Sequence, residues 1–408
     1  MLKDPLTHRH RSIKMTTALN PQIVSFLQEN ETQMFSLLED LVVIQSSSHN
    51  KVGVDRVARA IETFLSNSSA ICRTVTQEHS GNHLVIRSPA AEADGRRQAL
   101  LVGHMDTVFP QDTAFNWYKE DEHHSYGPGV IDMKGGLVVG LFALSALDAA
   151  GLLSEIPITF ICNADEEIGS GTSGAMIRKE ARHSAFAFVL ECGGLNGEVV
   201  TGRKGNLSAK IDVTGEAGHA AFAGQDKASA ILELAHKTIA LEALNAPERG
   251  ITVNVGQVQG GIGPNTVPAL ASARIDMRFL TLPEGSALEK HLKEIVAHQQ
   301  VPNTAATCQV LTGRPPMPKC DANHNLYEIV QAVASDLGYY IQPEFRQGVS
   351  DANLIAAENV PVIDGLGPLG GRDHSEEEYM IKSSLLQRTI LLACAIPACY
   401  AKYSAQSH

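Results

Sequence analysis

The chain has 408 residues, of which 44% are hydrophobic and 19% are charged, the ordinary composition of a soluble globular protein of about two or three domains. Its formal net charge of -12 argues against nucleic acid or an anionic membrane surface as a partner. No apolar run approaches the length of a membrane span, so we expect no membrane association.

The chain opens with a polar stretch and two helical patterns. Residues 1–20 lack the apolar middle of a secretory signal, and we expect a disordered arm there, or a true start at Met15 instead of Met1. The patterns that follow predict helices at 21–44 and 52–65 and short strands at 70–76 and 83–86.

Strands and helices then alternate. The predicted order is a strand at 98–106, a helix at 135–150, a strand at 156–162, a helix at 172–181 and a strand at 185–191. Such alternation implies an α/β fold, a mostly parallel mixed sheet with helices on both faces. We assign residues 21–206 and 315–408 to this main domain, whose ligands should collect at the carboxyl ends of the strands.

The pattern changes between these two segments. Residues 207–314 predict strand, helix, strand, strand, helix, strand, which is a small two-layer α+β domain inserted into the first. In one of its strands Ile275, Met277 and Phe279 alternate with charged residues, so one face should be buried. After the insertion, α/β alternation resumes and leads to a long helix from about Ser383.

The cysteines indicate a reducing compartment. The chain has seven, an odd count, and no pair has CxxC spacing. A disulfide framework or a structural zinc knuckle is therefore not expected, and we predict reduced, mostly buried thiols in a cytoplasmic protein.

The first candidate site lies at the end of the strand 98–106. In an extended strand His104 and Asp106 share a face, and the Asp106 carboxylate can accept a hydrogen bond from the second ring nitrogen of His104. That bond fixes the tautomer of a ligating histidine. A strand-end histidine packed on its neighbour is the alternative, which the HxD pair alone favours.

Acidic residues supply the next candidates. Asp132, in YGPGVIDMKGG, precedes a predicted buried helix, where an N-cap aspartate is the alternative. Three like charges, Asp165, Glu166 and Glu167, close a buried strand, where they repel one another and lose hydration. In an extended backbone Glu166 and Glu167 point in opposite directions, so one can ligate a metal while the other faces a bound water.

Two further ligand candidates follow apolar or glycine-rich segments. Glu191 ends another apolar strand in LECGG, and His374 follows a glycine-rich loop in GGRDHSEEE, whose Glu376 to Glu378 are expected to be a solvated charge run. Histidines and carboxylates without thiolate suit a catalytic zinc site. Five ligands suit two ions about 3.5–4 Å apart that share one carboxylate, and two dications would neutralise the clustered acids.

An ordered set of motifs carries a family resemblance from about residue 20 to the C-terminus. The motifs are HMDTVFP, YGPGVIDMKGG, NADEEIGS, LECGG, GEAGHAAFAG and GGRDHS. The set resembles the zinc peptidases and deacylases that include carboxypeptidase G, acetylornithine deacetylase, succinyl-diaminopimelate desuccinylase and aminoacylase. It is most similar to the carboxypeptidase G (glutamate carboxypeptidase) type through HMDTV, YGPG, the DEE triplet and GRP.

The resemblance implies a role for each matched residue near the metal ions. His104 and Glu191 would bind one zinc ion, Glu167 and His374 the other, and Asp132 would bridge them across a cis peptide bond to Met133. Two Zn²⁺ per subunit are expected, with Co²⁺ or Mn²⁺ as substitutes. The resemblance also assigns Glu166 as general base and acid, and Asp106 as the partner of His104.

The resemblance places further residues on the substrate. His219 would polarise the scissile carbonyl in the partner subunit of a homodimer that forms through the inserted domain; a loop histidine on a sheet edge is the alternative. Asn265, Arg278 and Arg314 would hold the substrate carboxylate, with a solvated strand face and a domain-junction salt bridge as alternatives for the two arginines. Gly348 lies in GVSDAN, where relatives carry a Gly/Thr-rich turn near the carboxylate, and this difference leaves the substrate preference open.

Three functions fit this sequence. The first is a glutamate-releasing carboxypeptidase, the second a deacylase of N-acyl amino acids, and both cut an amide beside a free carboxylate. The third is a non-catalytic relative that binds amino acid derivatives, whose expected mark is a lost ligand or lost base. Every matched position is filled here, which favours a small peptide or N-acyl amino acid as a substrate that is hydrolysed.

Overall fold

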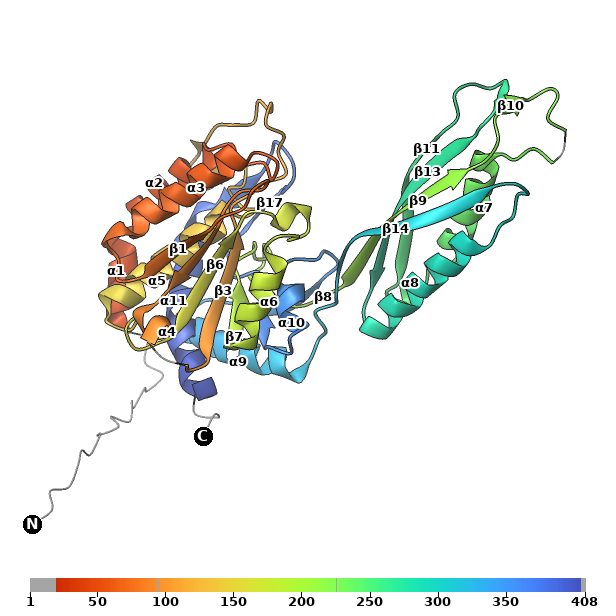
Figure 1. Ribbon diagram of the computed structural model, residues 1–408. Coiled ribbons are helices and arrows are strands. Elements are labelled where there is room, and N and C mark those ends of the chain that lie inside the picture. The colour runs from red at the N-terminus through yellow and green to blue at the C-terminus, as the bar shows by residue number, and fades with distance from the viewer. Residues whose placement is uncertain (1–19, 94, 225, 405–408) are drawn as a thin grey trace, which may run out of the picture.

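The computed structural model describes residues 20–93, 95–224 and 226–404. Apart from Asn20, the expected N-terminal arm and the choice between Met1 and Met15 lie outside the described residues. Figure 1 shows a main body built on a broad sheet and a slender second body joined to it beside β8 (Glu198–Arg203).

The main body is organised around a six-stranded sheet with the order β1-β2-β6-β3-β7-β16. Its strands are β1 (Ile71–Val75), β2 (His83–Arg87), β3 (Gln98–His104), β6 (Ile158–Asn163), β7 (Ser184–Val189) and β16 (Val362–Ile363). The four strands from β6 to β16 in this order run parallel, whereas β2 is antiparallel to both of its neighbours, β6 and β1. The predicted mostly parallel mixed sheet is therefore confirmed.

Helices cover both faces of this sheet because its central strands are apolar on both sides. In β3, Leu101 packs into one core while Leu100 and Val102 pack into another on the opposite face. The first core is covered by α1 (Pro21–Glu29), α2 (Glu31–Val42), α3 (Lys51–Phe64), α5 (Lys134–Ala149), α9 (Asp321–Asp336) and α11 (Lys382–Ser404). The second is covered by α6 (Gly174–Arg182) and α10 (Ala352–Ala356).

The first predicted helix is divided in two. Residues 21–44 were expected as one helix, but α1 ends and α2 begins at Asn30. The Asn30 amide donates a 2.7 Å hydrogen bond to the carbonyl of Phe26, so the side chain competes with the backbone for that acceptor. Asparagine competes in this way more readily than most residues, and the single-helix prediction was wrong for this reason.

The C-terminal helix α11 is a core helix. By length and composition alone it could cross a membrane, so the prediction that no apolar run approaches the length of a membrane span was wrong. In the structure 67% of its apolar window is buried, and it packs beside α5 and α9 (Figure 1). Burial within the protein accounts for its apolar character.

Two small sheets surround the central one. One has the order β17-β18-β5-β4, with β17 (Gly370–Gly371), β18 (Tyr379–Ile381), β5 (His124–Tyr126) and β4 (Lys119–Glu120). The other pairs β15 (Gln342–Arg346) with β8. The first brings the segment after residue 370 against the segment before residue 127, although the two are far apart in the sequence.

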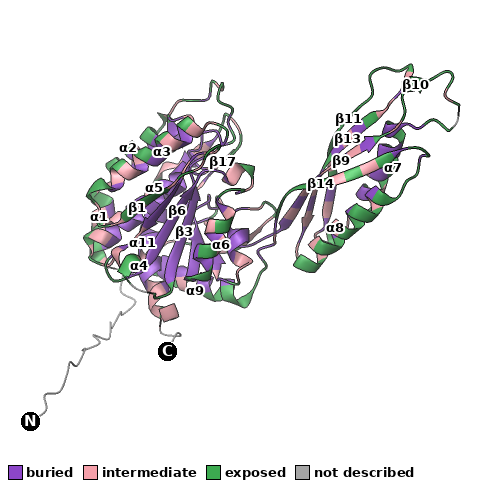
Figure 2. Cartoon of the chain, in the orientation of Figure 1, coloured by how far each residue is buried: buried purple, intermediate pink, exposed green. Residues whose placement is uncertain are grey.

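The second body, which we call the insert, extends from Gly205 to Arg314 and has its own core. Its antiparallel sheet has the order β11-β13-β9-β14, made of β9 (Gly205–Thr214), β11 (Thr252–Gly260), β13 (Leu270–Phe279) and β14 (Ala305–Arg314). The helices α7 (Ala230–Glu242) and α8 (Leu282–Ala297) pack on one face, which buries Ile275, Met277 and Phe279 as expected. On the other face, the outward residues of β9 and β13 are mostly half-buried, whereas Figure 2 shows the tip largely exposed. The tip carries the short pair β10 (Gly218–His219) and β12 (Thr266–Val267).

The cysteines carry free thiols in the structure. Cys162 and Cys399 are buried, four others are half-buried and Cys320 is exposed. The expectation of mostly buried thiols was therefore wrong in degree.

Candidate metal centre

Three neighbouring strands of the central sheet end at the same place. β3 ends at His104, which lies opposite Asn163, the last residue of β6. Glu166 and Glu167 follow β6, and Glu191 follows β7 by two residues. The carboxyl ends of parallel strands therefore gather these groups, as expected for ligand sites in such sheets.

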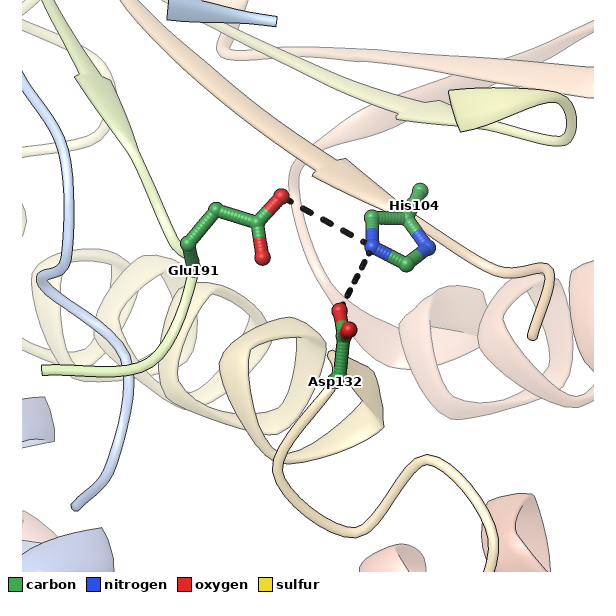
Figure 3. Close-up of side chains that lie close together, drawn as sticks. All are labelled: His104, Asp132 and Glu191. Atoms are coloured by element: carbon green, nitrogen blue, oxygen red, sulfur yellow. Dashed lines mark hydrogen bonds and ion pairs between the residues drawn. The ribbon is translucent and has the colours of Figure 1, made fainter. Parts of the chain in front are cut away.

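A fourth side chain, Asp132, joins this cluster from the loop before α5. Nε2 of His104 lies 3.1 Å from Oδ1 of Asp132 and 3.7 Å from Oε1 of Glu191. Figure 3 shows the Asp132 and Glu191 carboxylates converging on the same nitrogen of His104. The peptide bond from Asp132 to Met133 is cis, as the family resemblance implies.

The second oxygen of Asp132 serves a second group. Nε2 of His374 lies 3.1 Å from Oδ2 of Asp132 and 3.4 Å from Oε2 of Glu167. In each group of three, the ligand atoms lie within 4.8 Å of one another. The structure thus brings together all five predicted metal ligands as two groups that share Asp132.

Glu166 and Glu167 diverge, but not for the reason expected. They lie in the 3₁₀ turn η2 (Glu166–Ile168), so the prediction of an extended backbone was wrong. Within this turn Glu167 faces His374, while Glu166 faces Arg314. Oε1 of Glu167 is buried without a hydrogen-bond partner among the described residues. Buried polar atoms normally have a partner, and a bound cation would supply one here.

Asp106 supports the cluster in two ways. Nδ1 of His104 lies 2.9 Å from the backbone carbonyl of Asp106 and 3.4 Å from its carboxylate, so the carbonyl is the nearer partner. The carboxylate accepts a 2.6 Å hydrogen bond from Ser48 and two 3.3 Å bonds from the amides of Glu166 and Glu167. Asp106 therefore orients His104 and also anchors the turn that carries both glutamates.

The electrostatics of the cluster reflect crowded charge. Burial raises the pKa of Glu191 well above its usual value, and the nearby Asp132 adds to this shift. Burial also raises the pKa of Glu167 to about 7. For Asp132 burial opposes ionisation, but hydrogen bonds from His104 and His374 outweigh it and hold the pKa below its usual range. The same hydrogen bonds to carboxylates raise the pKa of His374 to about 11.

Glu378 is a site residue that the sequence reasoning missed. It was expected in a solvated charge run, but its side chain is 0% exposed. Its carboxylate accepts hydrogen bonds from the amides of Gly129, Ile131 and Asp132 at 2.8 to 3.1 Å. Burial raises the pKa of Glu378 to about 8, and these amides oppose the shift. Its neighbours Glu376 and Glu377 are exposed as predicted.

The donor set fits divalent metal ions. Two imidazole nitrogens and three carboxylates, one of them shared, match the ligands that zinc takes at catalytic sites, and no thiolate is present in either group. The unpartnered oxygen of Glu167 and the raised pKa values of the buried acids both call for positive charge at this position. Bound dications would therefore relieve the repulsion between the acids.

The predicted substrate residues on the insert lie elsewhere. His219 and Asn265 are exposed at the tip, where the Asn265 carbonyl accepts a 2.9 Å hydrogen bond from Ala220. Figure 1 shows this tip at the far end of the insert from the strand ends of the main body. Arg278 and Gly348 lie together near the junction of the two bodies, since Arg278 contacts the carbonyl of Gln347 at 3.4 Å.

Arg314, the last predicted substrate residue, is only 4% exposed and is already paired. It forms an ion pair with Oε1 of Glu166 and lies 3.3 Å from the carboxylate of Asp351, and it donates a 2.7 Å bond to Ser170. This placement matches the alternative of a domain-junction salt bridge. A role of Arg314 toward a substrate carboxylate stays a prediction.

Comparison with curated proteins finds distant relatives that span most of the chain. Carboxypeptidase G2 from a Pseudomonas species is 26% identical over 373 residues, which cover 90% of this chain and 89% of that protein. Acetylornithine deacetylase from Yersinia pseudotuberculosis is 27% identical over 300 residues, which cover 66% of this chain and 74% of that protein.

Comparison with solved structures supports the fold. The aminopeptidase PepT from Bacillus cereus superposes with a TM-score of 0.74 at 21% identity and covers 91% of this chain and 99% of that one. The model of the peptidase family M20/M25/M40 matches residues 100–398, which include every residue of both ligand groups. The chain therefore belongs to the peptidase family M20/M25/M40 and is a metal-dependent amide hydrolase.

Proposed function

We propose that the protein is a two-zinc exopeptidase of the glutamate carboxypeptidase type, which cleaves an amide bond next to a free carboxylate. The observation that carries the proposal is the pair of ligand groups that share Asp132, with Glu166, which belongs to neither group, beside them. The similarity to carboxypeptidase G2 over 90% of the chain supports the carboxypeptidase assignment.

In this proposal the metal ions are held by the two ligand groups. His104, Asp132 and Glu191 would hold one, and Asp132, Glu167 and His374 the other. When bound, two dications lower the pKa of a water molecule toward about 7 and polarise the scissile carbonyl. Zinc is the expected ion, and Co²⁺ or Mn²⁺ are expected to substitute for it.

Glu166 performs the proton transfers. Arg314 contacts Oε1 of Glu166, whereas the described residues donate no hydrogen bond to Oε2. This free oxygen can take a proton from the attacking water and return it to the leaving nitrogen. The Arg314 pair keeps the Glu166 side chain in one orientation between these two steps.

The insert supplies the substrate contacts. His219 donates a hydrogen bond to the oxyanion, and Asn265 and Arg278 bind the free carboxylate of the substrate. The position of the tip in Figure 1 supports delivery of His219 to the active site of a partner subunit. The enzyme is accordingly proposed to be a homodimer in the cytoplasm.

An apolar surface on the insert supports this dimer. Ile239 on α7 is 70% exposed and Val258 on β11 is 54% exposed, and α7 packs beside β11. β11 is also an edge strand, whose unpaired backbone groups invite pairing with a second copy. Sedimentation of the zinc-loaded protein as a dimer is the expected result, and a fully active monomer would refute the arrangement.

A second function, deacylation of N-acyl amino acids, is favoured by the similarity to acetylornithine deacetylase. The metal ligands and Glu166 would do the same work in both reactions, so they do not separate the two. We expect the loop around Gly348 and the tip of the insert to decide between the two substrates, because the metal ligands and Glu166 serve both reactions alike.

A substrate panel separates these functions. We would measure kcat/KM of the zinc-loaded protein on folate-type and peptide C-terminal glutamates, other dipeptides, acetylornithine and other N-acyl amino acids. The Glu166→Ala variant, prepared in the same way, controls for a contaminating peptidase. We expect the highest kcat/KM for glutamate release. A preference for acyl substrates would establish the deacylase instead, and no hydrolysis by a protein with two bound zinc ions would contradict both.

A further inference from the structure

The loop that carries Asp132 is held by a single buried carboxylate. Oε1 of Glu378 accepts hydrogen bonds from the amides of Ile131 and Asp132 at 2.8 and 3.1 Å, and Oε2 accepts one from Gly129 at 3.0 Å. Three of four consecutive backbone amides therefore point at one side chain. A carboxylate offers only acceptors and can satisfy all three donors at once.

This arrangement connects the segment that carries His374 to the loop that carries the shared ligand, Asp132. Glu378 follows His374 by four residues and precedes β18, which pairs with β5 just before the Asp132 loop. The strand pairing sets the two segments side by side. The Glu378 carboxylate then holds residues 129–132, which lie beyond the paired strands. Asp132 must present one oxygen to His104 and the other to His374, each at 3.1 Å, so a small rotation of its backbone would disturb both contacts.

The hydrogen bonds of the Glu378 carboxylate all lie within this loop. The carboxylate is 0% exposed, and its hydrogen bonds join residues that lie 246 to 249 positions apart in the chain. Beyond these three amides, the described part of the chain offers it no hydrogen bond or ion pair. A carboxylate buried in this way is costly unless it is hydrogen-bonded, so its three donors indicate a specific role in holding the loop.

We propose that Glu378 is the positioning residue for the bridging ligand: its carboxylate holds the backbone of residues 129–132 so that Asp132 serves both metal sites. Glu378 belongs to neither ligand group and acts only through Asp132. The proposal concerns metal binding and does not depend on which amide the enzyme cleaves.

The test is metal binding by the Glu378→Gln variant. Glutamine keeps the shape but replaces one acceptor oxygen with an NH₂ donor, which must face an amide donor of the loop. Chelator-stripped protein would be titrated with Zn²⁺ against a competing chelator, and with Co²⁺ by its visible absorption. We expect the affinity for both ions to fall by about 10–100-fold, the range typical for groups that orient metal ligands. At saturating metal, kcat should fall while KM stays within about twofold, since substrate contacts are untouched.

Glu376→Gln is the matched control, because Glu376 lies in the same loop, loses the same charge and is exposed. It should bind metal like the wild type. A folded Glu378→Gln protein with wild-type Zn²⁺ affinity and Co²⁺ spectrum would overturn the proposal, even if its thermal stability were lower. Lower stability alone, with unchanged affinity, is what a merely structural residue would give.

If the variant does not fold, amide hydrogen exchange of the wild-type protein tests the same proposal. In metal-free wild-type protein the amides of Gly129, Ile131 and Asp132 should exchange slowly, because Glu378 already holds them. Fast exchange of these amides, with protection only after Zn²⁺ is added, would show that the metal and not Glu378 orders the loop and would overturn the proposal. Substrate turnover plays no part in this result, so it stands apart from the outcome of the substrate panel.

Discussion

The strand-end cluster and the tip of the insert display their chemical groups in opposite ways. In the cluster His104 is 1% exposed and Glu191 is 9% exposed, and each has partners within 4 Å. At the tip Phe222 is 86% exposed and Ile262 is 90% exposed, and the ring of Phe222 lies 4.9 Å from that of His219. The strand ends of the sheet hold the side chains of the cluster in place, whereas the tip exposes apolar and polar groups that a partner surface would cover.

Because of this difference, metal affinity and catalytic rate should depend on different parts of the molecule. Metal affinity should depend on residues of the main body alone, because both ligand groups lie there. Rate and substrate preference should depend on the tip as well, although none of its described residues belongs to a ligand group.

The largest effect is expected for Glu166→Ala. The variant should keep both metal ions, because Glu166 belongs to neither ligand group, and lose about 10²- to 10⁴-fold in kcat, the usual contribution of a general base. Metal analysis and kcat on the best substrate would check this. Near-normal turnover would remove Glu166 from the mechanism.

Arg314→Met should act on stability first. Arg314 is 4% exposed, and its loss would leave the half-buried carboxylate of Glu166 and the buried carboxylate of Asp351 without their cation. Breaking a buried pair in this way costs about 3–5 kcal/mol, measurable by urea denaturation of the metal-free protein. Unchanged stability with a large rise in KM would instead support the prediction that Arg314 holds the substrate carboxylate.

His219→Ala should lose about 10²- to 10³-fold in kcat at unchanged metal content, the loss typical for one oxyanion donor. Mixing this variant with Glu166→Ala, after dissociation and reassociation, tests where the histidine acts. If His219 serves the partner subunit, hybrid dimers contain one intact active site and recover activity. Mixtures as inactive as their components would place His219 and Glu166 in the same subunit's site.

Per unit of change, the smallest effect is the pH dependence of metal binding. In the metal-free protein hydrogen bonds to Asp132 and Glu167 raise the pKa of His374 to about 11, so this ligand is protonated at neutral pH. Burial raises the pKa of Glu167 to about 7, which adds a second proton below that pH. Because metal must displace these protons, Zn²⁺ affinity should fall by at least about tenfold per unit from pH 8 to 6. Affinity that is flat or rises in acid would contradict the assigned ligands.

Much of the site follows from local sequence patterns. Apolar strands followed at once by His104, Glu166, Glu167 and Glu191 predict a cluster, because parallel strands end at one edge of a sheet. The alternation of Ile275, Met277 and Phe279 with charged residues likewise predicted the buried face of β13. These inferences depend only on backbone periodicity and strand direction, which the sequence determined by itself.

Other features were decided by tertiary contacts. Nothing near Glu378 in the sequence distinguishes it from Glu376 and Glu377, and its three amide partners lie 246 to 249 residues away. Arg314 is an ion-pair partner of Glu166 because the end of β14 packs against the turn after β6, across 148 positions of the chain. The residue types in the sequence thus determined which chemistry the site can hold. The packing of distant segments decided which charged side chains are buried, because burial and pairing depend on what the folded chain brings alongside each of them.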